Sequence, residues 1–142
     1  MLRSYVLVFI QLACIIFIIL TGDILPSEIF LLIPGIVFVI ISFLSMAEMK
    51  FRFNIVPELL ENSSLVTSGP FKYVRHPIYT SIIFMILILV INDFTFLRFG
   101  VWIILVIVLN IKLNSEEKIL AREFPDYIVY KSKSKKLIPF IY

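Results

Sequence analysis

Four blocks of apolar sequence constrain the fold of this chain more than any other feature. Hydrophobic residues fill 61% of its 142 positions, whereas soluble domains are about 45–50% apolar. A membrane-crossing helix needs about 20 largely apolar residues, and the excess falls in blocks of this kind. The expected spans are residues 5–20, 29–47, 77–91 and 94–113. We therefore expect one all-α integral membrane domain over residues 1–142, with the polar segments 48–76 and 114–142 outside the bilayer.

The first apolar block is expected to be a retained membrane helix. It is longer than the apolar part of a typical signal peptide, no small-x-small cleavage site follows it, and Thr21-Gly22-Asp23 leads into another apolar span. The block also contains Cys14, the single cysteine of the chain. One cysteine excludes an internal disulfide and a cysteine-based metal cluster, and we expect no metal site.

The placement of the basic residues predicts the orientation in the membrane. Four spans put the N-terminus, segment 48–76 and the C-terminal segment on one side. That side and the adjoining helix ends hold twelve of the thirteen lysines and arginines, and the other side has Arg98 alone. By the positive-inside rule, both termini and both polar segments are cytoplasmic. A cytosolic ligand and a lipidic one could thus meet at the same surface. No nucleic-acid partner is expected.

The first polar cluster surrounds the only histidine, in the stretch 67–79. Pro77 suits the first position of a helix, and Arg75 and His76 stand directly before it. A helix N-terminus offers free N–H groups and a partial positive charge to an anion. A plainer interpretation is equally open here. Arg75 is then a positive-inside anchor, His76 an interfacial residue and Pro77 only a helix starter.

The second polar cluster is the pair Glu116-Glu117, where the fourth apolar block ends. Neighbouring side chains on a helix point about 100° apart, so the two carboxylates do not face each other, and one can face the bundle while the other faces water. Lys112 and Glu116 have the spacing of a helix ion pair. The pair could bind an ammonium group or ribose hydroxyls. It could also be a solvated helix end preceded by a snorkelling Lys112.

Taken together, these motifs resemble the isoprenylcysteine carboxyl methyltransferase and phospholipid methyltransferase superfamily. The resemblance covers roughly residues 62–142. It rests on Leu65-Val66-Thr67-Ser68-Gly69-Pro70-Phe71-Lys72-Tyr73-Val74-Arg75-His76-Pro77-Ile78-Tyr79-Thr80, on Glu116-Glu117 and on a tail of the form Phe124-Pro125-Asp126-Tyr127-x-x-Tyr130 that ends Leu137-Ile138-Pro139. The two first spans match only as membrane helices. The resemblance implies an integral membrane methyltransferase whose cytosol-facing pocket for S-adenosylmethionine is closed by the C-terminal helix or tail.

The resemblance also implies roles for individual residues. Lys112 stands where the isoprenylcysteine branch has an arginine near the substrate carboxylate, and a lysine lacks the bidentate fork of arginine. Arg75 and Glu117 are expected to serve catalysis with it. Two further departures are Ser81 and Pro125, which stand where glycine is common. The cofactor would be held by Ser64, Leu65, Val66, Phe71, His76, Pro77, Ile78, Tyr79 and Glu116.

The implied reaction is in-line transfer of the sulfonium methyl group to a lipophilic or prenylated substrate drawn from the membrane. A carboxylate acceptor of the isoprenylcysteine type is already anionic and needs no base. A phospholipid amine would first lose a proton, and Glu117 and Tyr79 are the nearest candidate bases.

Two other classes of protein compete with this interpretation. One is a membrane reductase with a nicotinamide cofactor, but such proteins are usually much longer than 142 residues. The other is a small four-helix transporter or a non-catalytic subunit. Proton-coupled transporters need an acidic residue in mid-membrane, and no span of this chain has a central Asp or Glu.

Overall fold

The computed structural model describes residues 2–50, 64–139 and 141, with the side chains of positions 2 and 3 left aside. Positions 51–63 of the expected cytosolic segment lie outside the described residues. The elements are α1 Leu2–Leu20, α2 Ile29–Glu48, the 3-10 helix η1 Gly69–Lys72, α3 Pro77–Asn92, α4 Phe96–Glu123 and α5 Tyr127–Lys133. Across these ranges there is no strand, only an isolated parallel bridge between Val74 and Lys135. The all-α prediction is confirmed.

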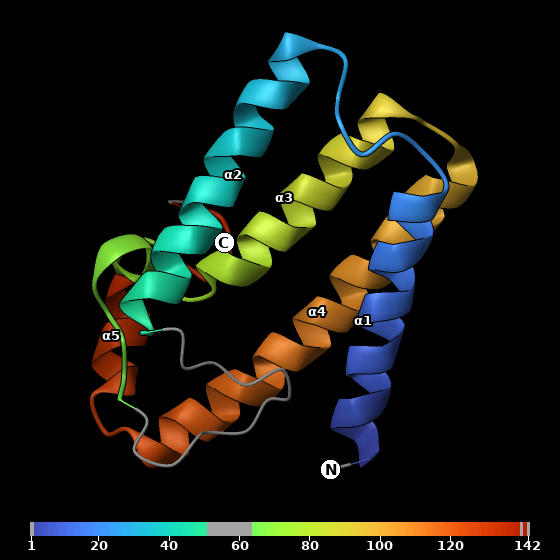
Figure 1. Cartoon of the computed structure of the whole chain (residues 1–142). Coiled ribbons are helices and arrows are strands. Elements are labelled where there is room, and N and C mark those ends of the chain that lie inside the picture. Colours follow the sequence, from blue (N-terminus) through green and yellow to red (C-terminus); the bar gives the residue numbers. More distant parts are fainter. Residues whose placement is uncertain (1, 51–63, 140, 142) are drawn as a thin grey trace.

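The long helices form two antiparallel pairs, and the apolar core lies among α1, α3 and α4. Figure 1 shows α2 beside α3 and α1 beside α4, and α3 also packs against α4. Ile18 of α1, Val90 of α3, and Leu105 and Leu109 of α4 are fully buried in this core. Leu137 from the C-terminal tail joins them. The core therefore draws on three long helices and on the end of the chain.

The outer faces of α1 and α2 carry large apolar side chains. Phe9, Phe30 and Phe43 are each more than half exposed, which water-soluble monomers rarely show over a continuous surface. Two helices, Ile29–Glu48 and Phe96–Glu123, are long and apolar enough to cross a bilayer, whereas the apolar stretches Ser4–Leu20 and Pro77–Asn92 are shorter. These features are those of a membrane protein.

Polar contacts tie the two hairpin turns together at one end of the bundle. The backbone N–H of Asp23 donates to Asp93 Oδ2 at 2.8 Å, and that of Ser27 donates to Asn92 Oδ1 at 3.4 Å. The buried Arg98 donates from Nη2 to the carbonyl of Leu89 at 2.7 Å. The two polar clusters lie at the opposite end of the bundle.

The C-terminal tail folds back onto the loop that precedes α3. The N–H of Arg75 donates to the carbonyl of Lys135 at 2.7 Å, and the N–H of Lys135 donates to the carbonyl of Tyr73 at 3.1 Å. The hydroxyl of Tyr130 in α5 donates to the carbonyl of Phe71 at 2.7 Å. Figure 1 shows α5 beside this loop. The segment that precedes the α3–α4 hairpin in the sequence and the segment that follows it therefore meet at the polar end of α4.

Candidate functional site

A glycine turn anchors the loop that carries His76. Gly69 has a φ of +56°, a conformation that favours glycine, and a Cβ there would lie 2.8 Å from Glu48 Oε1. The hydroxyl of Ser68 donates to the same carboxylate at the end of α2. After η1, Pro77 occupies the first turn of α3 and His76 is its N-cap. The loop is thereby fixed to α2 at one end and to α3 at the other.

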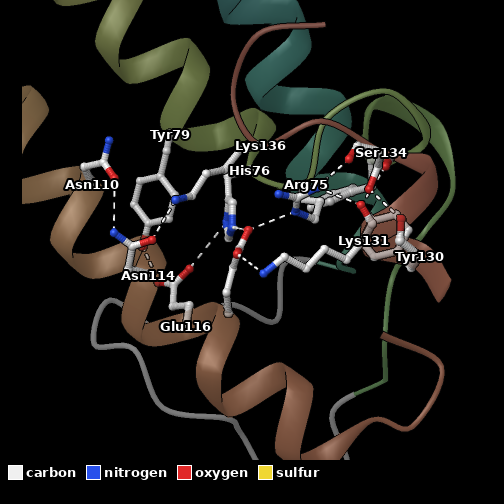
Figure 2. Close-up of polar contacts among 12 residues, drawn as sticks. Arg75, His76, Tyr79, Asn110, Asn114, Glu116, Tyr130, Lys131, Ser134 and Lys136 are labelled. Atoms are coloured by element: carbon white, nitrogen blue, oxygen red, sulfur yellow. Dashed lines mark hydrogen bonds and ion pairs between the residues drawn. The ribbon is translucent and has the colours of Figure 1, made fainter. Parts of the chain in front are cut away.

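Glu117 is the centre of a polar cluster, and its partners Arg75, His76 and Lys131 are labelled in Figure 2. Its Oε1 lies 2.8 Å from Nε of Arg75 and 3.3 Å from Nε2 of His76, and its Oε2 lies 3.1 Å from Nζ of Lys131. Burial raises the pKa of the Glu117 carboxyl, but hydrogen bonds from His76, Arg75 and Lys131 outweigh burial and hold that pKa well below its usual range. The side chain is thus a buried, charged carboxylate.

Glu116 faces the same imidazole from the other side. Its Oε2 lies 3.7 Å from Nδ1 of His76, and its Oε1 accepts a hydrogen bond from the hydroxyl of Tyr79. Burial raises the pKa of this carboxyl, the opposite direction from its neighbour. The two carboxylates differ in exposure, but neither points fully into water. The Glu117 side chain is 8% exposed and that of Glu116 is 22% exposed, because loop and tail cover this end of α4.

Arg75 connects the carboxylate cluster to the tail. Its Nη1 donates to the carbonyl of Lys131 at 3.2 Å and to the carbonyl of Ser134, while its Nε binds Glu117. In Figure 2, dashed lines join the Arg75 guanidinium to the tail at Lys131 and Ser134. The interpretation of Arg75 as a simple positive-inside anchor does not account for these contacts.

Lys112 lies one turn before Glu116 and points into the bundle. It is 2% exposed, its Nζ donates to Gln11 Oε1 at 2.8 Å, and it stands 5.5 Å from the centre of the Tyr79 ring, within cation–π range. The snorkelling interpretation is therefore wrong. Gln11 was not among the predicted site residues, although a polar side chain within an apolar span is a recognisable signal.

The other predicted cofactor residues take less part in the carboxylate cluster. Pro77 and Phe71 are buried and Ile78 is half-buried at the start of α3, while the carbonyl of Phe71 accepts the Tyr130 hydroxyl. Within the described ranges, residues 64–66 make no hydrogen bond or ion pair with the carboxylate cluster. The structure thus brings together the predicted residues Arg75, His76, Tyr79, Lys112, Glu116 and Glu117.

An open cavity of about 440 Å³ adjoins this cluster. Two of the predicted catalytic residues, Arg75 and Glu117, line it, and none of the nine predicted cofactor residues does. The remaining lining comes from Asn114 and from the tail, at Lys131, Ser132, Lys133, Ser134, Lys135, Lys136 and Ile141. The sequence did not predict Lys131 and Ser134 as partners of the cluster, because a lysine in a basic tail is usually a solvated charge.

Comparisons with known proteins support the resemblance. Neither the curated proteins nor the solved structures give a match. The model of the isoprenylcysteine carboxyl methyltransferase (ICMT) family matches residues 29–122, about two thirds of the chain. This range includes α2 as well as α3 and α4, so the likeness begins earlier than position 62, and it contains His76 and the Glu116-Glu117 pair. The chain belongs to the isoprenylcysteine carboxyl methyltransferase family.

Proposed function

We propose that this protein transfers a methyl group from S-adenosylmethionine to the carboxylate of an isoprenylcysteine-like lipid at the cytosolic membrane face. One observation carries the proposal. Within the range that matches the family, a loop before α3 and the polar end of α4 place His76 and Tyr79 against Glu116 and Glu117. The cluster lies where an apolar helix leaves its apolar stretch, so a soluble cofactor and a lipidic acceptor could both reach it.

Glu116 is the residue best suited to hold the cofactor. S-adenosylmethionine would supply an activated methyl group on a sulfonium, together with an ammonium group and ribose hydroxyls. The Glu116 carboxylate keeps 22% of its side chain exposed and is oriented by Tyr79 and His76. A partly exposed carboxylate in this setting fits an ammonium or a hydroxyl donor. The proposed cofactor site therefore centres on His76, Tyr79 and Glu116, with Phe71, Pro77, Ile78 and residues 64–66 as its walls.

The contacts of Glu117 favour a carboxylate acceptor over an amine. A protonated amine would have to give up a proton before attacking the methyl group. Glu117 already accepts from Arg75, His76 and Lys131, and its lowered pKa makes it a weak base. The Tyr79 hydroxyl donates to Glu116. A carboxylate would attack the methyl carbon directly: the C–O bond of a neutral ester would form as the C–S bond breaks and its electron pair returns to sulfur. No proton would move, and neither residue would have to act as a base.

Lys112 is the proposed partner of the acceptor carboxylate. It lies one turn before Glu116, is buried, and stands over the Tyr79 ring. A buried ammonium attracts a carboxylate more strongly than one in water does. Holding the acceptor beside the cofactor is the main work left to the protein, and good positioning is worth about 7–11 kcal/mol in favourable reactions.

The membrane arrangement that goes with this function has four spans, with both termini in the cytoplasm. The exposed apolar faces of α1 and α2 support it. At 16 residues, α3 reaches about 24 Å, somewhat less than the hydrocarbon core of a bilayer. Packing of α3 between α2 and α4 supports its place in the bundle.

Cofactor binding provides the first test. Detergent-solubilised protein is titrated with S-adenosylhomocysteine by calorimetry, together with Glu116→Ala, His76→Ala and the matched control Lys118→Ala, an exposed position on the same helix. We expect saturable binding by wild type and the control, and at least a tenfold loss in the other two variants. No binding by the wild type refutes the methyltransferase proposal. Equal binding by all four proteins refutes the site.

The nature of the acceptor provides the second test. The protein is incubated with methyl-labelled cofactor and either an S-prenylated N-acetylcysteine or a phosphatidylethanolamine. A methyl ester releases labelled methanol in base, whereas an N-methyl group does not. We expect base-labile label on the prenylated acid and no label on the amine. Base-stable label on the phospholipid would identify an amine N-methyltransferase instead.

A further inference from the structure

The cavity between the polar end of α4 and the C-terminal tail is lined mainly by positively charged side chains. About 440 Å³ of space is enclosed on one side by the tail and on the other by Arg75, Asn114 and Glu117. Among the residues that the structure describes, the lining contains five basic side chains and one acidic side chain. The basic ones are Arg75, Lys131, Lys133, Lys135 and Lys136.

The single acidic side chain does not neutralise this charge. Glu117 is held by Arg75 and Lys131, at 2.8 and 3.1 Å, as well as by His76. Among the residues that the structure describes, no carboxylate pairs with Lys133 or Lys135, and both are exposed. The cavity therefore keeps an excess of positive charge that suits an anion.

Apolar side chains at the same place indicate where the anion comes from. Ile141 lines the cavity and is 76% exposed. On α5, Ile128 is 69% and Val129 55% exposed, although the helix lies directly beside the basic residues. Exposed apolar side chains add nothing to the binding of a soluble anion. They can add to the binding of a lipid, because its phosphate can contact the lysines while its acyl chains lie along the isoleucines, as at other basic segments on membrane surfaces.

We propose that this cavity binds the phosphate of an acidic phospholipid, with Lys133 and Lys135 as its principal contacts. Such binding would hold the tail on the membrane surface above the His76 cluster. The site is separate from the proposed cofactor residues, none of which lines the cavity, so it stands whether or not the chain transfers methyl groups.

Lipid binding is measured on the full chain released from neutral detergent micelles, by native mass spectrometry. The probes are dioctanoyl phosphatidylglycerol, dioctanoyl phosphatidylcholine and soluble glycerol phosphate. We expect one retained phosphatidylglycerol, binding at least tenfold more tightly than phosphatidylcholine, and no competition from millimolar glycerol phosphate. Equal affinity for the two lipids would overturn the proposal. So would efficient competition by glycerol phosphate, which would indicate a soluble anion as the natural ligand.

Two double variants with the same change in net charge locate the site. Lys133→Gln/Lys135→Gln removes two cavity cations, and Lys118→Gln/Arg122→Gln removes two exposed cations of α4 that do not line the cavity. A lysine near an acidic membrane contributes enough attraction that losing two should weaken binding roughly tenfold or more. The α4 variant should change binding less than twofold. Equal weakening in both variants would mean diffuse surface charge and no built site.

Discussion

His76 presents its two ring nitrogens to two consecutive carboxylates of one helix. Nδ1 faces Glu116 and Nε2 faces Glu117, at 3.7 and 3.3 Å. Helix geometry separates the two side-chain directions by about 100°, so a single group can meet both only if it comes from outside the helix, between them. The loop before α3 supplies that group. Burial raises the pKa of both carboxyls, but at Glu117 the hydrogen bonds from His76, Arg75 and Lys131 together outweigh it, which is why the two pKa values move in opposite directions.

Replacing Glu117 should destabilise the fold. Glu117→Gln removes the negative charge that faces Arg75 and Lys131 and leaves a guanidinium that is 9% exposed with a neutral partner. Breaking a buried pair in this way costs about 3 kcal/mol. Thermal unfolding in detergent should show a clear drop of the midpoint. Glu123→Gln, an exposed carboxylate on the same helix, should leave the midpoint within a degree or two. Equal midpoints for both variants would contradict a structural role for the cluster.

A comparison of wild type with Glu117→Gln also tests how the stability depends on pH. Because the folded-state pKa of Glu117 lies below its ordinary value of 4.5, the unfolded state takes up the proton first as pH falls. The stability from Glu117 is therefore complete above about pH 4.5 and is lost as pH falls through the folded-state pKa. Wild type should lose more stability than Glu117→Gln between pH 5 and pH 3. Parallel curves over this range would show that the carboxylate has no lowered pKa.

At the scale of the elements, polar contacts at two levels hold α1 to α4. Midway along α1, Gln11 binds Lys112, and beyond the end of α1 Arg98 lies beside the turn, with Nη1 3.4 Å from Thr21 Oγ1. The turn can approach this closely because position 22 is glycine. A Cβ on Gly22 would overlap the guanidinium of Arg98. The two helices are thus aligned by polar groups as well as by their apolar core.

Gly22→Ala should destabilise the protein by about 1–3 kcal/mol, the usual cost of overpacking a tight site. The matched control is Gly100→Ala in α4, where an added Cβ meets no atom within 4 Å. Alanine there should be neutral or stabilising by up to about 1 kcal/mol, since glycine is a poor helix former. The measurement is the unfolding free energy in detergent. A Gly22→Ala protein as stable as wild type would contradict the packing of Arg98 against this turn.

The tail is held to the His76 loop by single hydrogen bonds, and Tyr130 makes one of them. Tyr130→Phe removes its bond to the carbonyl of Phe71, which is worth about 1 kcal/mol. Hydrogen exchange of the Lys135 amide, bonded to the carbonyl of Tyr73, should become roughly fivefold faster. Tyr73→Phe serves as the control, because the Tyr73 side chain is 57% exposed. Unchanged exchange in Tyr130→Phe would show that this bond does not hold the tail.

At the scale of the whole molecule, local signals in the sequence predicted the elements well. Apolar blocks and the helix start at Pro77 depend on neighbours in the chain, and the first three apolar blocks coincide with α1, α2 and α3 to within three residues. The fourth block, 94–113, is shorter than α4, which continues ten residues further to Glu123. The contacts that join distant elements could not be predicted in this way. Gln11 and Lys112 are 101 positions apart. Which basic residue reaches Glu117 depends on the path by which the tail folds back.

The orientation of the chain can be tested by single cysteines. Lys133→Cys lies in the tail and Leu25→Cys at the opposite end of the bundle, and both positions are exposed, whereas the native Cys14 is buried. If the tail is cytoplasmic, a membrane-impermeant maleimide on intact cells should label position 25 at once and position 133 only after permeabilisation. The reverse pattern would place the cluster on the outer side. Labelling of both positions in intact cells would exclude the four-span arrangement.

The guanidinium of Arg75 links the charge of Glu117 to the position of the tail. It binds Glu117 on α4 and the carbonyls of Lys131 and Ser134 in the tail at the same time. Detachment of the tail would therefore take from Glu117 its Lys131 partner, 3.1 Å away, and from Arg75 its two carbonyl partners. By thermodynamic linkage, a proton taken up by Glu117 would then favour a detached tail. We therefore expect acid to loosen the tail as well as the ion pairs at the centre of the cluster.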